Sequence, residues 1–174
     1  LAGARVLARK GMSLEGWMYF PQLPELADFA RAVPELTIIL DHIGGLMRTG
    51  PYANGGDELM ATWRSGIAAV AACPNVNIKL GGVGMPLTGF DWHQRDQPIG
   101  SEELAESMAP FMNYCIEQFG PDRSMFESNF PVDKVGYSYH VMYNAFKRLS
   151  SGYSDSERAS MFHDTAARVY KVED

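Results

Sequence analysis

The sequence predicts an α/β fold built on a parallel β-sheet. Two observations carry this prediction: short apolar strand segments alternate with amphipathic helical segments, and polar residues gather directly after the strands. Parallel neighbours need long crossover connections, which helices of this kind supply. About four strand–helix units can be distinguished along the 174 residues.

Four segments are predicted to be strands because each is short and largely apolar, with β-branched or aromatic residues. In chain order they are SLEGWMYF at 13–20, LTIIL at 36–40, VNIKL at 76–80 and RSMFES at 123–128. LTIIL is apolar on both faces, as expected of a parallel strand buried between two layers.

Five segments are predicted to be helices because apolar residues recur along one stripe of each. In chain order they are residues 23–33, 57–73, 101–120, 138–149 and 154–170. Pro34, Pro74 and Gly120 end the first three. Ser101 and Ser154 are followed by glutamates in capping range, so each is predicted to cap the start of its helix.

The chain length leaves two architectures open. A complete (β/α)₈ barrel takes about 250 residues, so this chain is short by about three to four units. An open doubly wound sheet would fit 174 residues better by itself. No internal repeat or low-complexity linker interrupts the chain, which predicts one domain or part of one.

Composition argues against several classes of partner. The net charge of −6 is spread over scattered residues, without a basic patch for nucleic acid or for an anionic membrane. No apolar run approaches the roughly 18–20 residues of a membrane span. Cys73 and Cys115 lie among helical apolar residues and are predicted to be reduced core thiols, which favours the cytoplasm.

Polar residues lie at or just after the carboxyl ends of three predicted strands, where parallel α/β folds keep their chemistry. They are Asp41, His42, Lys79, Glu127, Ser128 and Asn129. His42 fits a structural hydrogen bond as well as it fits catalysis. Lys79 lies inside a strand and needs a partner or a shifted pKa. Ser128 lacks a G-x-S-x-G context, which argues against a serine nucleophile.

The connection over residues 86–101 is too long for a tight turn, and such loops often serve as lids. His93 in this loop could cover a substrate or face solvent. Trp92 is the tryptophan that we expect to touch a ligand. His140 and His163 fall within helical patterns and are expected to be surface or packing residues.

Three strand-end segments together resemble the amidohydrolase-related family, especially its lactonase-like branch of TIM-barrel metal-dependent hydrolases. They are LDHIGG at 40–45, NVNIKLGG at 75–82 and MFESNFPVD at 125–133. The resemblance implies that residues 1–174 are an amidohydrolase-related domain, incomplete at its N-terminus. They would form the C-terminal portion, about four β/α units, of a TIM (β/α)₈ barrel. The first residue, Leu1, is not a methionine, which agrees with this expectation.

The resemblance also implies roles for single residues. His42 would be the strand-six histidine that binds substrate or activates water. The family's strand-eight aspartate is a metal ligand or a base, and Asn129 stands at that position here. Because an amide is neither a base nor a good zinc ligand, Asp133 is the residue that could take its place. Phe20 stands where many relatives carry a histidine.

A divalent metal such as zinc is implied for the full-length protein. This chain offers one histidine and at most one carboxylate, fewer than the three protein ligands of a catalytic zinc site. Its own residues therefore do not predict a metal site, and the metal ligands stay unassigned.

The leading hypothesis is a hydrolase that opens a lactone of a sugar acid or of a ring-cleavage product by water attack. The predicted catalytic residues are His42, Asp133 and Asn129, with Asp133 or an upstream carboxylate accepting the proton. His42 and Lys79 would polarise the carbonyl or bind a carboxylate, and Arg95 would help to hold anionic groups. The predicted substrate-binding residues are Lys79, His93, Trp92, Glu127 and Arg95.

Two alternatives stay open. The changes at Asn129 and Phe20 are compatible with a noncatalytic half-barrel that binds a small molecule. A metal-dependent decarboxylase would need an acidic substrate and tightly bound zinc. In every case a half-barrel would expose two strand edges and one apolar sheet face. We therefore expect a homo-oligomer or a separate N-terminal half-barrel as partner.

Overall fold

A computed structural model describes residues 1–172 of the chain. Four parallel strands form one sheet in the order β1-β2-β3-β4. The strands are β1 (Leu14–Gly16), β2 (Ile38–Leu40), β3 (Val76–Leu80) and β4 (Ser124–Phe126). This arrangement confirms the predicted α/β fold with a parallel sheet.

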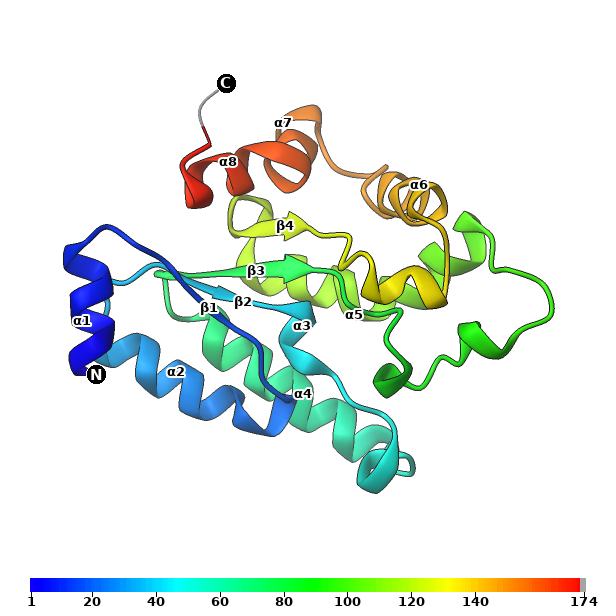
Figure 1. Cartoon of the computed structure of the whole chain (residues 1–174), viewed down its shortest axis with the longest axis horizontal. Coiled ribbons are helices and arrows are strands. Elements are labelled where there is room, and N and C mark those ends of the chain that lie inside the picture. The colour runs from blue at the N-terminus through cyan, green and yellow to red at the C-terminus, as the bar shows by residue number, and fades with distance from the viewer. Residues whose placement is uncertain (173–174) are drawn as a thin grey trace.

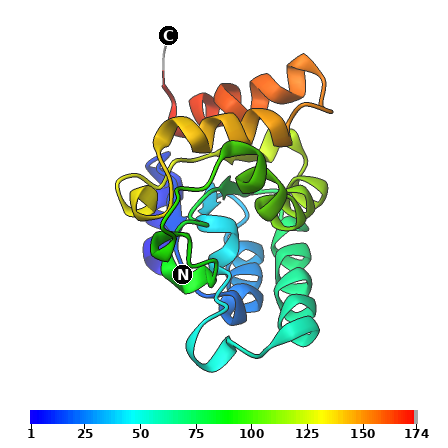
Figure 2. The same ribbon diagram turned by 90° about the vertical axis from the view of Figure 1, so that its right-hand side faces the viewer.

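Helices precede the first strand, connect successive strands and follow the last one. They are α1 (Ala2–Arg9), α2 (Leu23–Ala32), α3 (His42–Gly45), α4 (Gly56–Ala71), α5 (Ser101–Phe119), α6 (Tyr139–Leu149), α7 (Asp155–Ala159) and α8 (Thr165–Tyr170). In Figure 1, α2 and α4 lie on one side of the strands, and α6, α7 and α8 lie beyond β4. Figure 2 shows the same arrangement from the end of the molecule.

The two faces of the sheet differ in chemistry because successive side chains of a strand alternate between them. One face carries Ile38, Leu40, Ile78 and Leu80, all fully buried in the core that the helices form. Burying each such side chain stabilises the fold by about 1.5–3 kcal/mol. The opposite face carries the polar residues, with Lys79 opposite Met125 in register.

The C-terminal helix covers part of that second face. Ile39, Met125 and Val169 form a separate buried cluster, with Val169 contributed by α8. Arg168 of α8 donates a hydrogen bond to the Asp122 carbonyl in the turn before β4. The expectation of an exposed apolar sheet face was therefore wrong: the second face is polar around Lys79, and the chain's own last helix covers its apolar part.

Several element boundaries differ from the sequence-based expectation. Helix α1 was not predicted. The helix expected over 154–170 is divided by a π-helical turn at Ser160–Asp164, although the predicted capping box of Ser154 with Glu157 is confirmed. Gly100, not Ser101, is the N-cap residue of α5, so that capping prediction was wrong.

Two composition-based expectations can be compared with the fold. Cys73 and Cys115 are both free and buried, which confirms their assignment as core thiols. Within residues 1–172, no helix has both the length and the hydropathy required to cross a bilayer.

Candidate active site

A strained turn follows β2 and presents His42. His42 and Ile43 have φ angles of 53° and 48°, in the left-handed region that a β-branched residue such as isoleucine rarely adopts. The surroundings impose this conformation, because Ile43 is buried and its carbonyl accepts a 2.9 Å hydrogen bond from the Trp63 indole. Backbone strain held in place at a strand end is typical of functional sites.

His42 forms a close pair with Glu127, which follows β4. The Nδ1 atom of His42 lies 2.5 Å from Oε1 of Glu127, and the same oxygen accepts from the His42 backbone N–H at 3.3 Å. Because a carboxylate can only accept, Nδ1 is the donor. In the neutral imidazole the proton is therefore on Nδ1, and Nε2 is left as an acceptor. No residue between 1 and 172 hydrogen-bonds to Nε2.

The environment shifts the titration of His42. Burial disfavours the charged imidazolium, but the hydrogen bond and the negative charge of Glu127 outweigh this effect. The result is a pKa of His42 above its ordinary value. Side-chain exposures of 17% for His42 and 14% for Glu127 show that the pair is largely shielded from solvent yet accessible from one side.

The glycines of NVNIKLGG make room for this pair. A Cβ atom on Gly81 would lie 2.2 Å from Cγ of Glu127. A Cβ atom on Gly82 would lie 2.6 Å from Cβ and Cγ of His42, and Gly82 also has a φ of +70°. Both positions therefore require the absence of a side chain, which gives the glycine pair a physical explanation.

Lys79 lies among three carboxylates from three other strand ends. Its Nζ is 3.0 Å from Glu15 Oε1, 3.2 Å from Asp41 Oδ1 and 3.9 Å from Glu127 Oε2. Burial alone would lower the pKa of Lys79, but these acceptors and the Tyr170 hydroxyl raise it above its ordinary value. The ammonium is thus charged, and the neighbouring carboxylates already balance its charge. This argues against its predicted role in holding a substrate carboxylate.

Asp133 points back from the turn at Pro131 but is completely buried. Its Oδ1 accepts from Asn129 Nδ2 at 2.7 Å, and its Oδ2 accepts from the Gly84 N–H at 3.0 Å and the Tyr137 hydroxyl at 2.7 Å. Burial raises the pKa of Asp133 even against these three donors. The carboxylate cannot reach a water in the mouth, which argues against its predicted role as a base.

The same contacts give Asp133 a positioning role. Asn129 has a φ of 49°, a left-handed conformation that asparagine tolerates, and its amide is anchored on Asp133. Of the three predicted catalytic residues, His42 thus pairs with Glu127, which was predicted to bind substrate, whereas Asp133 is a buried support beneath Asn129.

The long loop does not bring its predicted ligand contacts to the pair. Trp92 is buried and stacks on Phe90 with ring centroids 4.3 Å apart, so it packs within the protein instead of lining the mouth. His93 is exposed at the surface of the loop. Arg95 is also exposed, and its Nη1 pairs with Glu103 at 2.8 Å. The burial of Trp92 argues against its predicted contact with a ligand, whereas the substrate-binding roles of His93 and Arg95 stay predictions.

Other residues near His42 were missed by sequence reasoning. Trp17, just past β1, is 51% exposed, and its ring centroid lies 6.3 Å from that of His42. Glu15 and Tyr170 complete the surroundings of Lys79, with Tyr170 donating a hydrogen bond to Glu15. The strand predicted over 13–20 contains Glu15 and Trp17, and because β1 ends earlier, at Gly16, the sequence did not mark them as residues at a strand end.

The donor set of this chain does not fit a catalytic metal. Among residues 1–172, no group of three His, Cys, Asp or Glu side chains is arranged to hold a metal ion. The carboxylates that come closest together already surround the Lys79 ammonium. Phe20 is buried in the core and packs against Tyr52, which explains why a hydrophobic residue is accommodated there.

Comparison with known proteins decides the family. The model of the amidohydrolase family matches residues 13–172. The chain belongs to the amidohydrolase family. This amidohydrolase is 39% identical over 170 residues to the uncharacterized protein y4mH of Sinorhizobium fredii, covering 98% of the chain and 50% of that protein. It is 28% identical over 152 residues to an L-fucono-1,5-lactonase of Burkholderia multivorans, covering 87% and 48%.

Solved structures agree with this assignment. A zinc-bound amidohydrolase of Burkholderia multivorans matches with a TM-score of 0.83 and 26% identity, over 99% of this chain and 57% of the neighbour. Amidohydrolase 2 of Bifidobacterium longum subsp. infantis matches with a TM-score of 0.65 and 27% identity, over 99% and 54%. The family predicted from the three strand-end motifs is confirmed. The amidohydrolase chain spans about half the length of the curated relatives it matches.

Proposed function

We propose that this amidohydrolase forms the C-terminal portion, about four β/α units, of a TIM (β/α)₈ barrel and carries part of a lactone-hydrolysing active site. The parallel sheet, with its polar residues at the carboxyl ends of the strands, supports the barrel. The family and the lactonase relative support the hydrolase. The remaining units and further site residues would come from an N-terminal half.

The His42–Glu127 pair is the observation that carries the proposed reaction. Glu127 holds the proton on Nδ1, so that Nε2 of neutral His42 accepts a proton from water as its oxygen bonds to the lactone carbonyl carbon. Glu127 stabilises the imidazolium that forms. The ring C–O bond then breaks, and the imidazolium returns its proton to the departing alkoxide.

Asn129 serves this reaction as an uncharged hydrogen-bonding group. Asn129 lies two residues after Glu127 along the chain, and its amide donates a hydrogen bond to Asp133. An amide both donates and accepts hydrogen bonds, which suits the hydroxyl and carbonyl groups of a lactone.

The charges around the site favour a neutral lactone over an anionic one. Glu15, Asp41 and Glu127 surround Lys79, so the cluster leaves no free cation, and Arg95 is paired with Glu103. A substrate carboxylate would meet repulsion there. We therefore favour the lactone of a sugar acid over a carboxylated ring-cleavage product. The same argument disfavours a decarboxylase, whose substrate must be an acid.

Hydrolysis of L-fucono-1,5-lactone by the full-length protein, followed through acid release, tests the proposal. His42→Ala should lower kcat/KM by at least about tenfold to a hundredfold. His140→Ala, which changes an exposed histidine on α6, should leave the rate unchanged. A lactone with carboxylate substituents, such as 2-pyrone-4,6-dicarboxylate, should be a poor substrate.

Two results would count against this function. An unchanged rate for His42→Ala would remove His42 from the mechanism. Binding of the sugar lactone without any turnover would instead support the noncatalytic half-barrel.

A further inference from the structure

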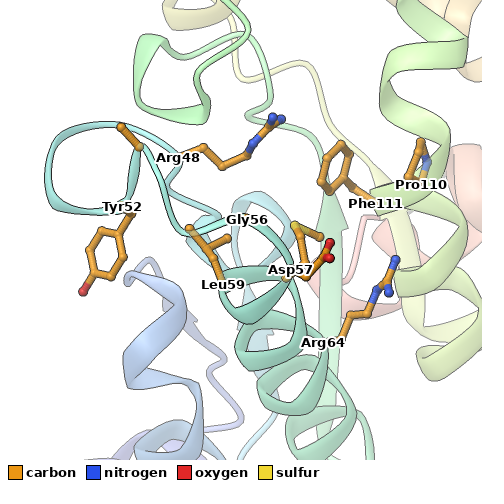
Figure 3. A pocket seen from close by; sticks show the side chains of 10 residues that line it. Arg48, Tyr52, Gly56, Asp57, Leu59, Arg64, Pro110 and Phe111 are labelled. Carbon is orange, nitrogen blue, oxygen red and sulfur yellow. The ribbon is translucent and has the colours of Figure 1, made fainter.

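A separate cavity of about 360 Å³ lies between the loop after α3, the first turns of α4 and the middle of α5 (Figure 3). Its lining includes Arg48, Asp57, Leu59, Arg64, Pro110 and Phe111. None of its lining residues belongs to the His42 cluster. The cavity is therefore distinct from the active site proposed above.

Arg48 is the key group of this cavity. Its guanidinium lies over two aromatic rings, 5.2 Å from the Phe90 centroid and 5.9 Å from the Phe111 centroid. The side chain is half-buried, and within residues 1–172 no carboxylate pairs with it. The backbone N–H of Arg48 and the hydroxyl of Thr49 both donate to the Leu87 carbonyl, which holds this loop in place.

A positioned guanidinium without a partner is suited to a carboxylate, which it can bind through two parallel hydrogen bonds. Arg64 supplies a second guanidinium, 5.7 Å from the Tyr114 ring centroid and likewise without an ion pair among the described residues. Asp57 brings one negative charge to the same lining. Two positive charges against one negative charge favour a ligand with a single negative charge.

The remaining lining defines the body of that ligand. Leu59, Pro110 and Phe111 supply an apolar wall. Figure 3 shows the Arg48 guanidinium turned toward the Phe111 ring, whereas Arg64 comes from farther along α4, beyond Asp57. A flat apolar group could pack against the Phe111 ring while its carboxylate faces the Arg48 guanidinium.

We propose that this cavity is a second ligand site, which binds a small organic monocarboxylate with a planar apolar body. Arg48 binds the carboxylate, and Phe111 and Leu59 contact the body. The site does not depend on the proposed lactone hydrolysis.

Calorimetric titration of the full-length protein with benzoate and with benzamide tests this site. The two probes share a ring and differ in the carboxylate, so benzoate should bind at least about tenfold more tightly. Arg48→Gln should weaken benzoate binding by about tenfold or more. Arg31→Gln is the matched control, because Arg31 is an exposed arginine on α2 that pairs with Asp28.

His42→Ala should keep its affinity for benzoate, which separates this site from the active site. Equal binding of the two probes, an unchanged affinity in Arg48→Gln, or loss of binding in His42→Ala would each overturn the proposal. Absence of benzoate binding at millimolar concentration would overturn it as well. If Arg48→Gln failed to fold, as judged by its thermal melt, Arg48→Lys would decide: it keeps the positive charge but loses the paired donors, so it too should weaken benzoate binding.

Discussion

The protonation of His42 is controlled by the Glu127 carboxylate, 2.5 Å away. Because the pKa of His42 is raised, the charged pair contributes stability below the unfolded-state pKa of about 6.5. That contribution is lost as the pH rises through the higher folded-state pKa. Catalysis has the opposite requirement, since only neutral His42 can accept a proton. Activity should therefore increase as the pH rises through the pKa of the folded protein.

Glu127→Gln should shift this ascending limb of kcat/KM to lower pH, because removal of the negative charge lowers the pKa of His42. The plateau should also decrease, by about tenfold, since the amide stabilises the imidazolium less well. A pH–rate profile of the two proteins checks this prediction. Glu106→Gln on the exposed side of α5 is the control and should leave the profile in place. An unshifted limb in Glu127→Gln would contradict the pairing.

Asp133 should act through position and not through proton transfer. Three donors now point at the Asp133 carboxylate, and Asp133→Asn would set an amide NH₂ against them. We therefore expect a loss of about 1–3 kcal/mol in the free energy of unfolding, together with reduced turnover. The ascending limb of the pH–rate profile should persist, because His42 still titrates. If the limb disappeared in this variant, Asp133 and not His42 would be the base. Urea denaturation and the pH–rate profile together distinguish the two roles.

At the scale of secondary-structure elements, one lysine joins four strand ends. Lys79 on β3 contacts Glu15 on β1, Asp41 after β2 and Glu127 after β4. The largely shielded ammonium offsets the repulsion that three neighbouring carboxylates would otherwise create. This arrangement keeps the carboxyl ends of the strands together and places Glu127 beside His42.

The turn after β3 has to pass close to the turn after β2. Gly82→Ala should disturb this approach, because its Cβ would lie 2.6 Å from His42 and its φ is +70°. We expect a loss of more than about 1 kcal/mol in the free energy of unfolding, together with lower kcat/KM. Gly152→Ala is the control, since a Cβ there meets no atom within 4 Å. Chemical denaturation and kinetics measure both effects, and wild-type behaviour of Gly82→Ala would disprove the close approach.

At the scale of the whole molecule, the sheet ends in two unpaired edge strands, β1 and β4, among the described residues. Trp17 and Tyr19 are exposed just beyond β1. Unpaired edges beside exposed aromatic rings favour association with another chain. The helix α8 reduces this tendency by covering Ile39 and Met125 with Val169.

We expect the 174-residue chain to self-associate, so that light scattering gives a mass above 19.3 kDa. Trp17→Ser should reduce the association, because it removes an exposed aromatic ring beside the β1 edge. Val6→Ser on α1 changes an exposed apolar residue elsewhere and should not. A stable monomer at high concentration would contradict the prediction of an oligomer.

The sequence by itself determined the parallel α/β fold, the family and the placement of His42 at a strand end. These features depend on local patterns: strand and helix periodicity, crossover helices and three short motifs. Only the tertiary structure decided which polar groups meet. His42 and Glu127 are 85 residues apart, and Lys79 and Glu15 are 64 apart. It also decided that Trp92 and Asp133 are buried, because burial depends on packing between distant segments, which local spacing does not specify.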